Sequence, residues 1–196
     1  MIVLVVAGCS SAPSSTDVPS EEKTPSSTPI DGGAPDATVV LLEAALAGRT
    51  QLVLEALEHG ADASAKGSDG RSALMLAAFD GHTETLRSLL DGGARVDDRD
   101  PSGRTALMYA ASGPHPESVQ LLLERKADPQ AVDQEEQFTA LMFAAAEGQA
   151  AVVRVLLEHG ADPGVVDVDG ETALDFATQK GHSQVVQILN ERERQE

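Results

Sequence analysis

Hydrophobic residues recur along most of this chain in two short blocks that are separated by turn residues. In the first block, Leu and Ala stand at i, i+3 and i+4, as in Leu74, Ala77 and Ala78. The same pattern returns as Leu107, Ala110, Ala111 and as Leu141, Ala144, Ala145. This spacing places the apolar side chains on one face of a helix. The second block repeats in the same way and ends on Gly93 or Gly160, so it predicts a second helix with a left-handed glycine at its end.

The two predicted helices form a unit of nearly constant length. The residues before the first helices are Ser72, Thr105, Thr139 and Thr172, at intervals of 33, 34 and 33 residues. Ser and Thr are good N-caps, worth about 1 kcal/mol each. A fixed period of this length predicts a solenoid of stacked helix pairs, each followed by a short loop rich in Asp and Gly.

The repeated motif DG-x-[ST]-A-L-M-x-A-A-x-x-G-H … L-L-x-x-G-A-D resembles the ankyrin repeat, over about residues 36–190. The resemblance implies an all-α solenoid of about five helix-turn-helix units with protruding loops. Ala replaces the usual Pro of the first helix, as at Ala73, and Met replaces the usual His, as at Met75. Both replacements are good helix formers and do not change the predicted fold.

We expect repeats at 36–68, 69–101, 102–135, 136–168 and 169–196. The first lacks the Asp-Gly turn, and the last carries Thr178 and Asn190 where other repeats have Ala and Leu. Terminal repeats differ because one side faces water. The third repeat has Lys126 where the left-handed glycine is expected, and the loop 132–138 has an extra residue and no glycine. Irregular repeats arise either at a binding patch or by drift, and the sequence does not separate the two.

The N-terminal residues are of a different kind. Residues 1–8 are apolar, and Val6-Ala7-Gly8-Cys9 resembles the lipobox of bacterial lipoproteins, in which a signal peptidase cuts before a cysteine that carries lipid. The apolar stretch is short and has no Lys or Arg before it, as in a truncated signal peptide. Residues 9–35 are rich in Ser, Thr and Pro and predict a disordered tether. We therefore expect an envelope protein that is membrane-anchored through Cys9; the alternative is an incidental thiol on a cytoplasmic scaffold.

The formal net charge of −18 affects which partners are expected. Nucleic acid is disfavoured because its phosphates require Lys and Arg. A basic protein partner is compatible with this charge, and so is an acidic surface that serves only solubility.

No set of residues indicates catalysis, a metal or a cofactor. The five histidines occupy positions fixed by the repeat, and the Asp-rich loops lack the alternating ligand spacing of a calcium site. A nucleophile with a nearby base is not visible. We expect a monomeric, non-catalytic module that binds another protein. A narrower hypothesis is an immunity or protective factor that masks a toxin.

The candidate binding surface combines one side of the first helices with the loop tips. One repeat position holds an aromatic residue in three of four repeats: Leu76, Tyr109, Phe143 and Phe176. The helix-end positions beside it are Phe79, Ser112, Ala146 and Gln179, and the loop tips add Arg99, Asp100, Glu135 and Glu136. The family resemblance places these first helices on the concave side of the stack. Aromatic side chains within an acidic rim are typical of a protein-binding groove; alternatively, the rings fill gaps between repeats.

Overall fold

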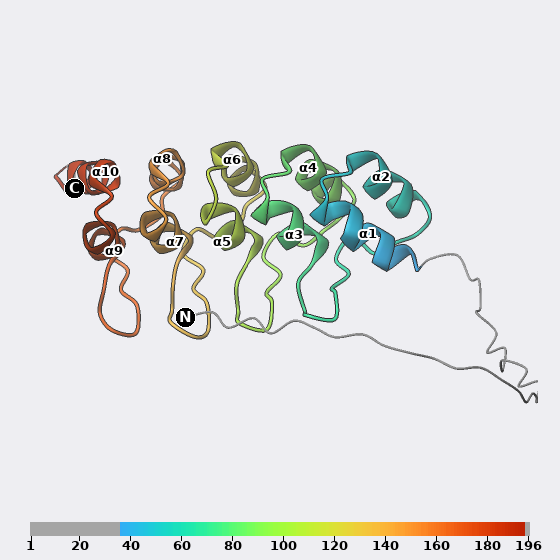
Figure 1. Ribbon diagram of the computed structural model, residues 1–196, viewed down its shortest axis with the longest axis horizontal. Helices are drawn as coiled ribbons and strands as arrows, with labels where there is room; N and C mark the ends of the chain where they lie inside the picture. Colours follow the sequence, from blue (N-terminus) through green and yellow to red (C-terminus); the bar gives the residue numbers. More distant parts are fainter. Residues whose placement is uncertain (1–35, 195–196) are drawn as a thin grey trace, which may run out of the picture. The chain divides into compact units, whose positions relative to one another are not determined.

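The computed structural model describes residues 36–194, which form ten helices and no strand. In chain order the helices are α1 (Ala37–Leu46), α2 (Thr50–Glu58), α3 (Ala73–Phe79), α4 (Thr83–Asp91), α5 (Ala106–Ala111), α6 (Pro116–Glu124), α7 (Ala140–Ala146), α8 (Ala150–Glu158), α9 (Ala173–Lys180) and α10 (Ser183–Glu193). The odd-numbered helices form one row, the even-numbered helices form a second row, and the connecting loops project from the side of the first row (Figure 1). The predicted all-α solenoid is confirmed.

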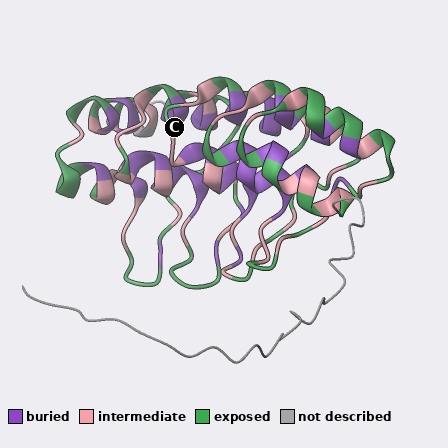
Figure 2. Ribbon diagram, turned by 45° about the vertical axis from the view of Figure 1, so that its right-hand side comes forward, coloured by how far each residue is buried: buried purple, intermediate pink, exposed green. Residues whose placement is uncertain are grey.

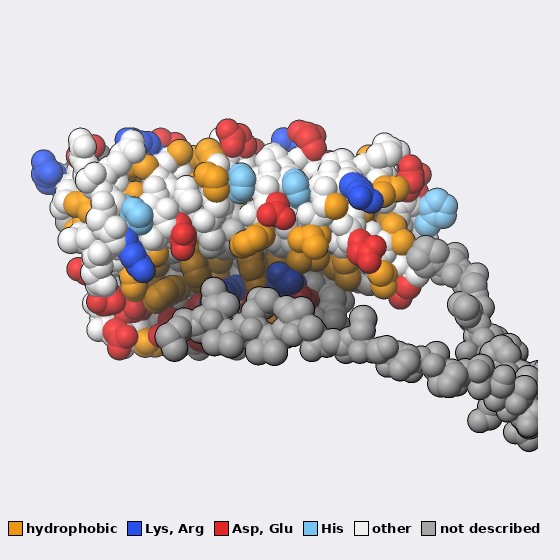
Figure 3. Space-filling view, viewed as in Figure 1, with side chains coloured by type: hydrophobic (Ala, Val, Ile, Leu, Met, Phe, Trp, Pro, Cys, Tyr) orange, Lys and Arg blue, Asp and Glu red, His pale blue; other side chains and the backbone are white. Residues whose placement is uncertain are grey.

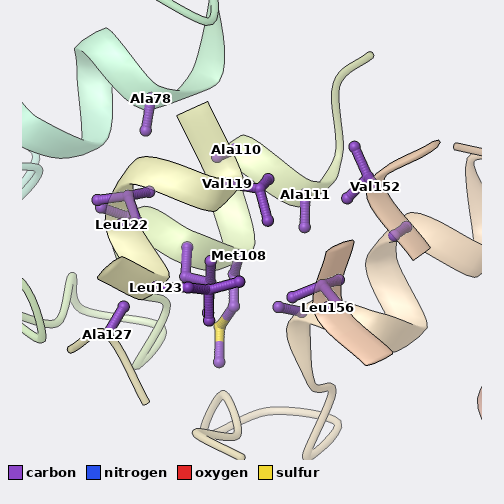
Figure 4. Packing of buried hydrophobic residues seen from close by; sticks show 14 of the residues in the cluster. Ala78, Met108, Ala110, Ala111, Val119, Leu122, Leu123, Ala127, Val152 and Leu156 are labelled. Carbon is purple, nitrogen blue, oxygen red and sulfur yellow. The ribbon is translucent and has the colours of Figure 1, made fainter. Parts of the chain in front are cut away.

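The core is a continuous layer of Leu and Ala between the two rows. Leu74, Leu107 and Leu141 are each 1% exposed, and the paired alanines that follow them are completely buried. Because alanine has no side chain beyond Cβ, adjacent first helices can approach closely along the stack. Buried residues form a band along the first-row helices (Figure 2). Leu122 of α6 and Leu156 of α8 belong to the same buried cluster as the first-row alanines, such as Ala110 and Ala111 (Figure 4).

Three of the four predicted N-caps make the expected hydrogen bond. The side-chain oxygens of Ser72, Thr139 and Thr172 each accept a hydrogen bond from the backbone N–H three residues later. The exception is Thr105, which precedes α5 but makes no side-chain cap bond. Its hydroxyl is buried without a hydrogen-bond partner in the described part of the chain. At this position the sequence prediction of the cap bond was wrong.

Within residues 36–194, two residues other than glycine adopt the left-handed conformation. Lys126, at the end of α6, has φ of 71°, where the other repeats have Gly60, Gly93 and Gly160. Gln137, in the loop that carries the extra residue, has φ of 61°. The left-handed conformation costs a residue with a Cβ on the order of 1 kcal/mol. Both irregular segments of the sequence therefore carry local backbone strain.

Histidines at the turn between paired helices pack against glycines of the preceding repeat. A Cβ added to Gly48 would lie 2.5 Å from Nδ1 of His82, and one added to Gly148 would lie 2.6 Å from Nδ1 of His182. The Nε2–H of His82 donates to the Leu46 carbonyl at 3.2 Å, and that of His182 donates to the Ala146 carbonyl at 3.0 Å. These histidines join adjacent repeats.

The two ends of the stack differ in polarity. Leu52, on α2, is 36% exposed, whereas Thr85 and Val152 at the same repeat position are almost fully buried by the preceding repeat. Val39, Leu46 and Leu54 are also exposed in the first repeat. At the other end Thr178 is exposed in a position that holds buried alanine in the other repeats. The first repeat therefore presents an apolar end and the last repeat a polar one.

Candidate binding surface

The first helices leave one side uncovered, and this side carries the predicted aromatic row. Leu76, Tyr109, Phe143 and Phe176 lie three residues before Phe79, Ser112, Ala146 and Gln179, so the two sets share a side of their helices. Together with the loop segments that lead into these helices, they form what we call the first-helix face. Figure 3 shows a band of hydrophobic side chains across this region, with acidic side chains on both sides of the band. Phe79 is 52% exposed, whereas Leu76 is only 8% exposed.

Rings of the row contact the neighbouring rings of Phe79 and Phe138 edge to face. The ring centroids of Phe79 and Tyr109 are 6.3 Å apart. Phe138 lies between two other rings, with centroid distances of 5.6 Å to Phe143 and 5.0 Å to Phe176. All of these rings except Phe79 are partly buried. The rings therefore pack between repeats and also remain partly exposed, so the two sequence interpretations are not exclusive.

Phe138 and Arg104 belong to this face, although the sequence interpretation did not include them. Both stand directly before the N-cap of a first helix, a position that holds Arg71 and Glu171 in other repeats. The guanidinium carbon of Arg104 lies 5.3 Å from the centroid of the Phe143 ring, within the range of a cation–π contact. Its Nε lies 3.6 Å from the buried carboxylate of Asp133. The common repeat position was the signal that could have identified both residues.

A small pocket opens at the centre of this face. Its volume is about 80 Å³, and its lining residues are Phe79, Arg104, Met108, Tyr109, Ser112 and Phe143. The lining comes from three consecutive repeats, so the pocket exists only in the stacked structure. Its walls are mostly apolar, with the Arg104 guanidinium at one edge. Such a pocket suits an apolar side chain of a partner.

Tyr109 is held in place by a loop residue. Its hydroxyl donates a hydrogen bond of 2.7 Å to Oδ2 of Asp100, while Oδ1 of Asp100 accepts the backbone N–H of Arg104 at 2.8 Å. Burial, followed by the hydrogen bond to Asp100, raises the pKa of Tyr109 to about 12. Asp100, which the sequence placed at a loop tip, therefore fixes the loop to the first helix.

The other predicted loop-tip residues also differ in their surroundings. Arg99 donates through Nη1 to the carbonyls of Gly103, at 2.8 Å, and Val132, at 2.6 Å, so it ties its loop to the next one. Glu135 accepts a hydrogen bond of 2.9 Å from the hydroxyl of Ser102. The Glu136 side chain is exposed and makes no hydrogen bond or ion pair in the described part of the chain. Of these three, Glu136 alone is free to contact a partner without losing an internal bond.

The structure provides no evidence for other chemistry within residues 36–194. No group of three or more His, Cys, Asp or Glu side chains in this range could hold a metal ion. None of the helices in this range has the length and apolar character needed to cross a bilayer. Cys9 and the predicted tether lie outside the described residues.

Comparison with known families agrees with the geometry. A family model described as ankyrin repeats, in three copies, matches residues 41–133 and 115–195. The chain belongs to the ankyrin-repeat family. A search of curated proteins found no match. Ankyrin repeats are protein–protein interaction modules, so this class of function holds for the chain.

Proposed function

We propose that this ankyrin stack binds a protein partner through its first-helix face and is anchored in the bacterial envelope by a lipid on Cys9. The single observation that carries the binding proposal is the half-exposed Phe79 beside the pocket that Tyr109 and Phe143 line. Aromatic side chains around a pocket near the centre of a surface are typical of the few residues that dominate binding energy.

The face is also rigid before binding, which favours affinity. Tyr109 is fixed by its hydrogen bond to Asp100, and Phe143 is held between Phe138 and the Arg104 guanidinium. Immobilising a side chain on binding costs about 0.5–1.5 kcal/mol, and side chains that are already fixed avoid most of this cost. The loops add to this rigidity because Lys66 and Arg99 each donate to a carbonyl of the next repeat, at 2.7 and 2.6 Å.

A capture experiment with matched variants tests the binding proposal. Full-length chains carrying Phe79→Ala or Leu54→Ala would be used to capture partners from native envelope extract. Both substitutions remove an exposed apolar side chain, but Leu54 lies on α2, a helix of the second row. We expect Phe79→Ala to lose a protein that the wild type and Leu54→Ala both retain. Equal retention by the two variants would contradict the proposal. A protective role, in which the module masks a toxin, would use the same surface, and the same experiment tests it.

The lipid anchor rests on residues 6–9 and needs a separate test. The small residues Ala7 and Gly8 directly before Cys9 support it, because a peptidase that cuts there must accommodate the backbone closely. Cells expressing the chain would be fed an alkyne fatty acid, and the purified protein examined for label. We expect label on the wild type and none on Cys9→Ser. Unlabelled wild-type protein in the soluble fraction would instead support the cytoplasmic scaffold.

A further inference from the structure

The apolar row of the first-helix face is bordered by carboxylates that have no partner within the stack. Asp80 and Glu147 follow Phe79 and Ala146 at the ends of α3 and α7, and both are exposed. On the loop side of the row, Glu136 and Asp169 are exposed as well. None of these four side chains makes a hydrogen bond or ion pair with any residue of the described part of the chain.

The cations of the same face are, in contrast, occupied by internal contacts. Arg71 forms an ion pair of 2.7 Å with Asp69, and Arg104 lies between Asp133 and the Phe143 ring. Lys66 and Arg99 donate to carbonyls of the next repeat. Among the described residues of this face the exception is Lys180, exposed at the end of α9 in the last repeat. From the second repeat to the fourth, the charge available to a partner is therefore negative.

We propose that the partner presents a cationic segment in which Lys or Arg residues flank an aliphatic side chain. The aliphatic side chain enters the pocket between Phe79 and Phe143, and the basic residues lie against Asp80 and Glu147 on one side and Glu136 on the other. A pocket of about 80 Å³ suits an aliphatic group better than an aromatic ring, since benzene occupies a cavity of about 150 Å³. This inference rests on the proposed function and specifies its partner.

The free carboxylates of this face affect which partners can bind more than how tightly they bind. Opposite charges at the border of an interface steer association and exclude partners of the wrong charge more than they add affinity. An acidic segment would meet the free carboxylates without a cation to neutralise them, because Arg71 and Arg104 are already paired. The arrangement therefore selects against acidic segments as well as for basic ones.

The test compares two variants with the same change in net charge. Asp80→Lys with Glu147→Lys changes the first-helix face, and Glu117→Lys with Glu158→Lys changes exposed positions at the two ends of second-row helices. Circular dichroism would check that both variants keep their helices. Their affinities would be measured for two short synthetic peptides, one of Leu, Lys and Ser and one of Leu, Glu and Ser. Neither peptide contains Tyr, so the emission of Tyr109, the chain's single tyrosine, reports binding.

We expect the Lys peptide to bind the wild type and the Glu peptide not to bind. The first-helix variant should bind the Lys peptide about tenfold more weakly than the second-row variant, with a loss of salt dependence. Equal weakening in the two variants would mean that the peptide responds only to net charge and would overturn the inference. Binding of the Glu peptide as tightly as the Lys peptide would overturn it too.

The two proposals can fail separately. If Phe79→Ala loses the captured partner but the first-helix charge variant keeps it, the face binds a protein that is not cationic. If neither change affects capture, the first-helix face is not the binding surface.

Discussion

The hydroxyl of Tyr109 donates a 2.7 Å hydrogen bond to the carboxylate of Asp100, which joins the centre of helix α5 to the loop before it. The same carboxylate accepts the backbone N–H of Arg104, whose guanidinium lies over Phe143 of the next repeat. One aspartate thus holds together the loop, the ring and the cation that line the pocket. The position of the pocket walls depends on this bond.

Titration of Tyr109 tests this bond directly. The chain contains one tyrosine and no tryptophan, so the absorbance of tyrosinate reports this residue alone. We expect a midpoint near the raised pKa of about 12 in the folded protein, and about 10 in concentrated urea. Because the folded pKa lies above the unfolded value, this group's contribution to stability is complete below pH ~10 and is lost as pH rises toward ~12.

Asp100→Asn should lower the folded pKa of Tyr109 only part of the way, because burial, the larger cause of the shift, remains. Asp169→Asn serves as the control, since the Asp169 side chain is exposed and makes no contact with Tyr109. A midpoint in the folded wild type that equals the value in urea would contradict the described environment of Tyr109.

Replacement of Lys126 by glycine should stabilise the stack. Lys126 has φ of 71°, a conformation that glycine adopts without strain. The expected gain in the free energy of unfolding is about 1 kcal/mol, measured by urea denaturation. Gln120→Gly, in the middle of α6, should instead cost about 0.5–1 kcal/mol. A destabilising effect of Lys126→Gly would show that the Lys126 side chain contributes more than its backbone strain costs.

Two glycine substitutions separate the stability cost of crowding a histidine of the next repeat from the cost of backbone strain. Gly81 and Gly160 both have positive φ, but a Cβ at Gly81 would lie 2.2 Å from the His115 ring, whereas one at Gly160 would meet nothing within 4 Å. Gly160→Ala should therefore cost only about 1 kcal/mol of left-handed strain. Gly81→Ala should cost about 1–3 kcal/mol more, because the ring must move.

In the Gly81→Ala background, His115→Ala removes the ring that the new Cβ meets. We expect the double variant to lose less stability than the sum of the two single variants. Strict additivity in urea denaturation would show that the ring and the added methyl group do not meet.

The sequence alone was sufficient for the parts of the fold that depend on local pattern. The period of the Leu and Ala positions predicted the helix pairs, and the caps predicted at Ser72, Thr139 and Thr172 are confirmed. The period also predicted the aromatic row, because residues at the same position of successive repeats lie in a line when the repeats stack. Whether that line binds a partner remains a prediction.

The sequence could not show which side chains are free and which are engaged. In the sequence, Arg99 and Asp100 are simply two adjacent charged residues at a loop tip. In the structure, Arg99 donates to the next loop, whereas Asp100 accepts a hydrogen bond from Tyr109. Thr105 has the same local sequence as the other caps and still lacks the cap bond. Phe138 lies beside the row because its loop places its ring against those of Phe143 and Phe176. The contacts of Arg99 with Val132, Asp100 with Tyr109 and Phe138 with Phe176 each join neighbouring repeats, so they depend on how the repeats stack.

The most direct measurement of the central claim is photo-crosslinking in the native envelope from two positions of the full chain. A benzophenone amino acid would replace Phe79, on the first-helix face, or Leu54, which is also exposed and apolar but lies on α2. We predict a discrete protein adduct from position 79 that is absent from position 54. An adduct of equal yield from both positions, or one from position 54 alone, would contradict binding at the first-helix face.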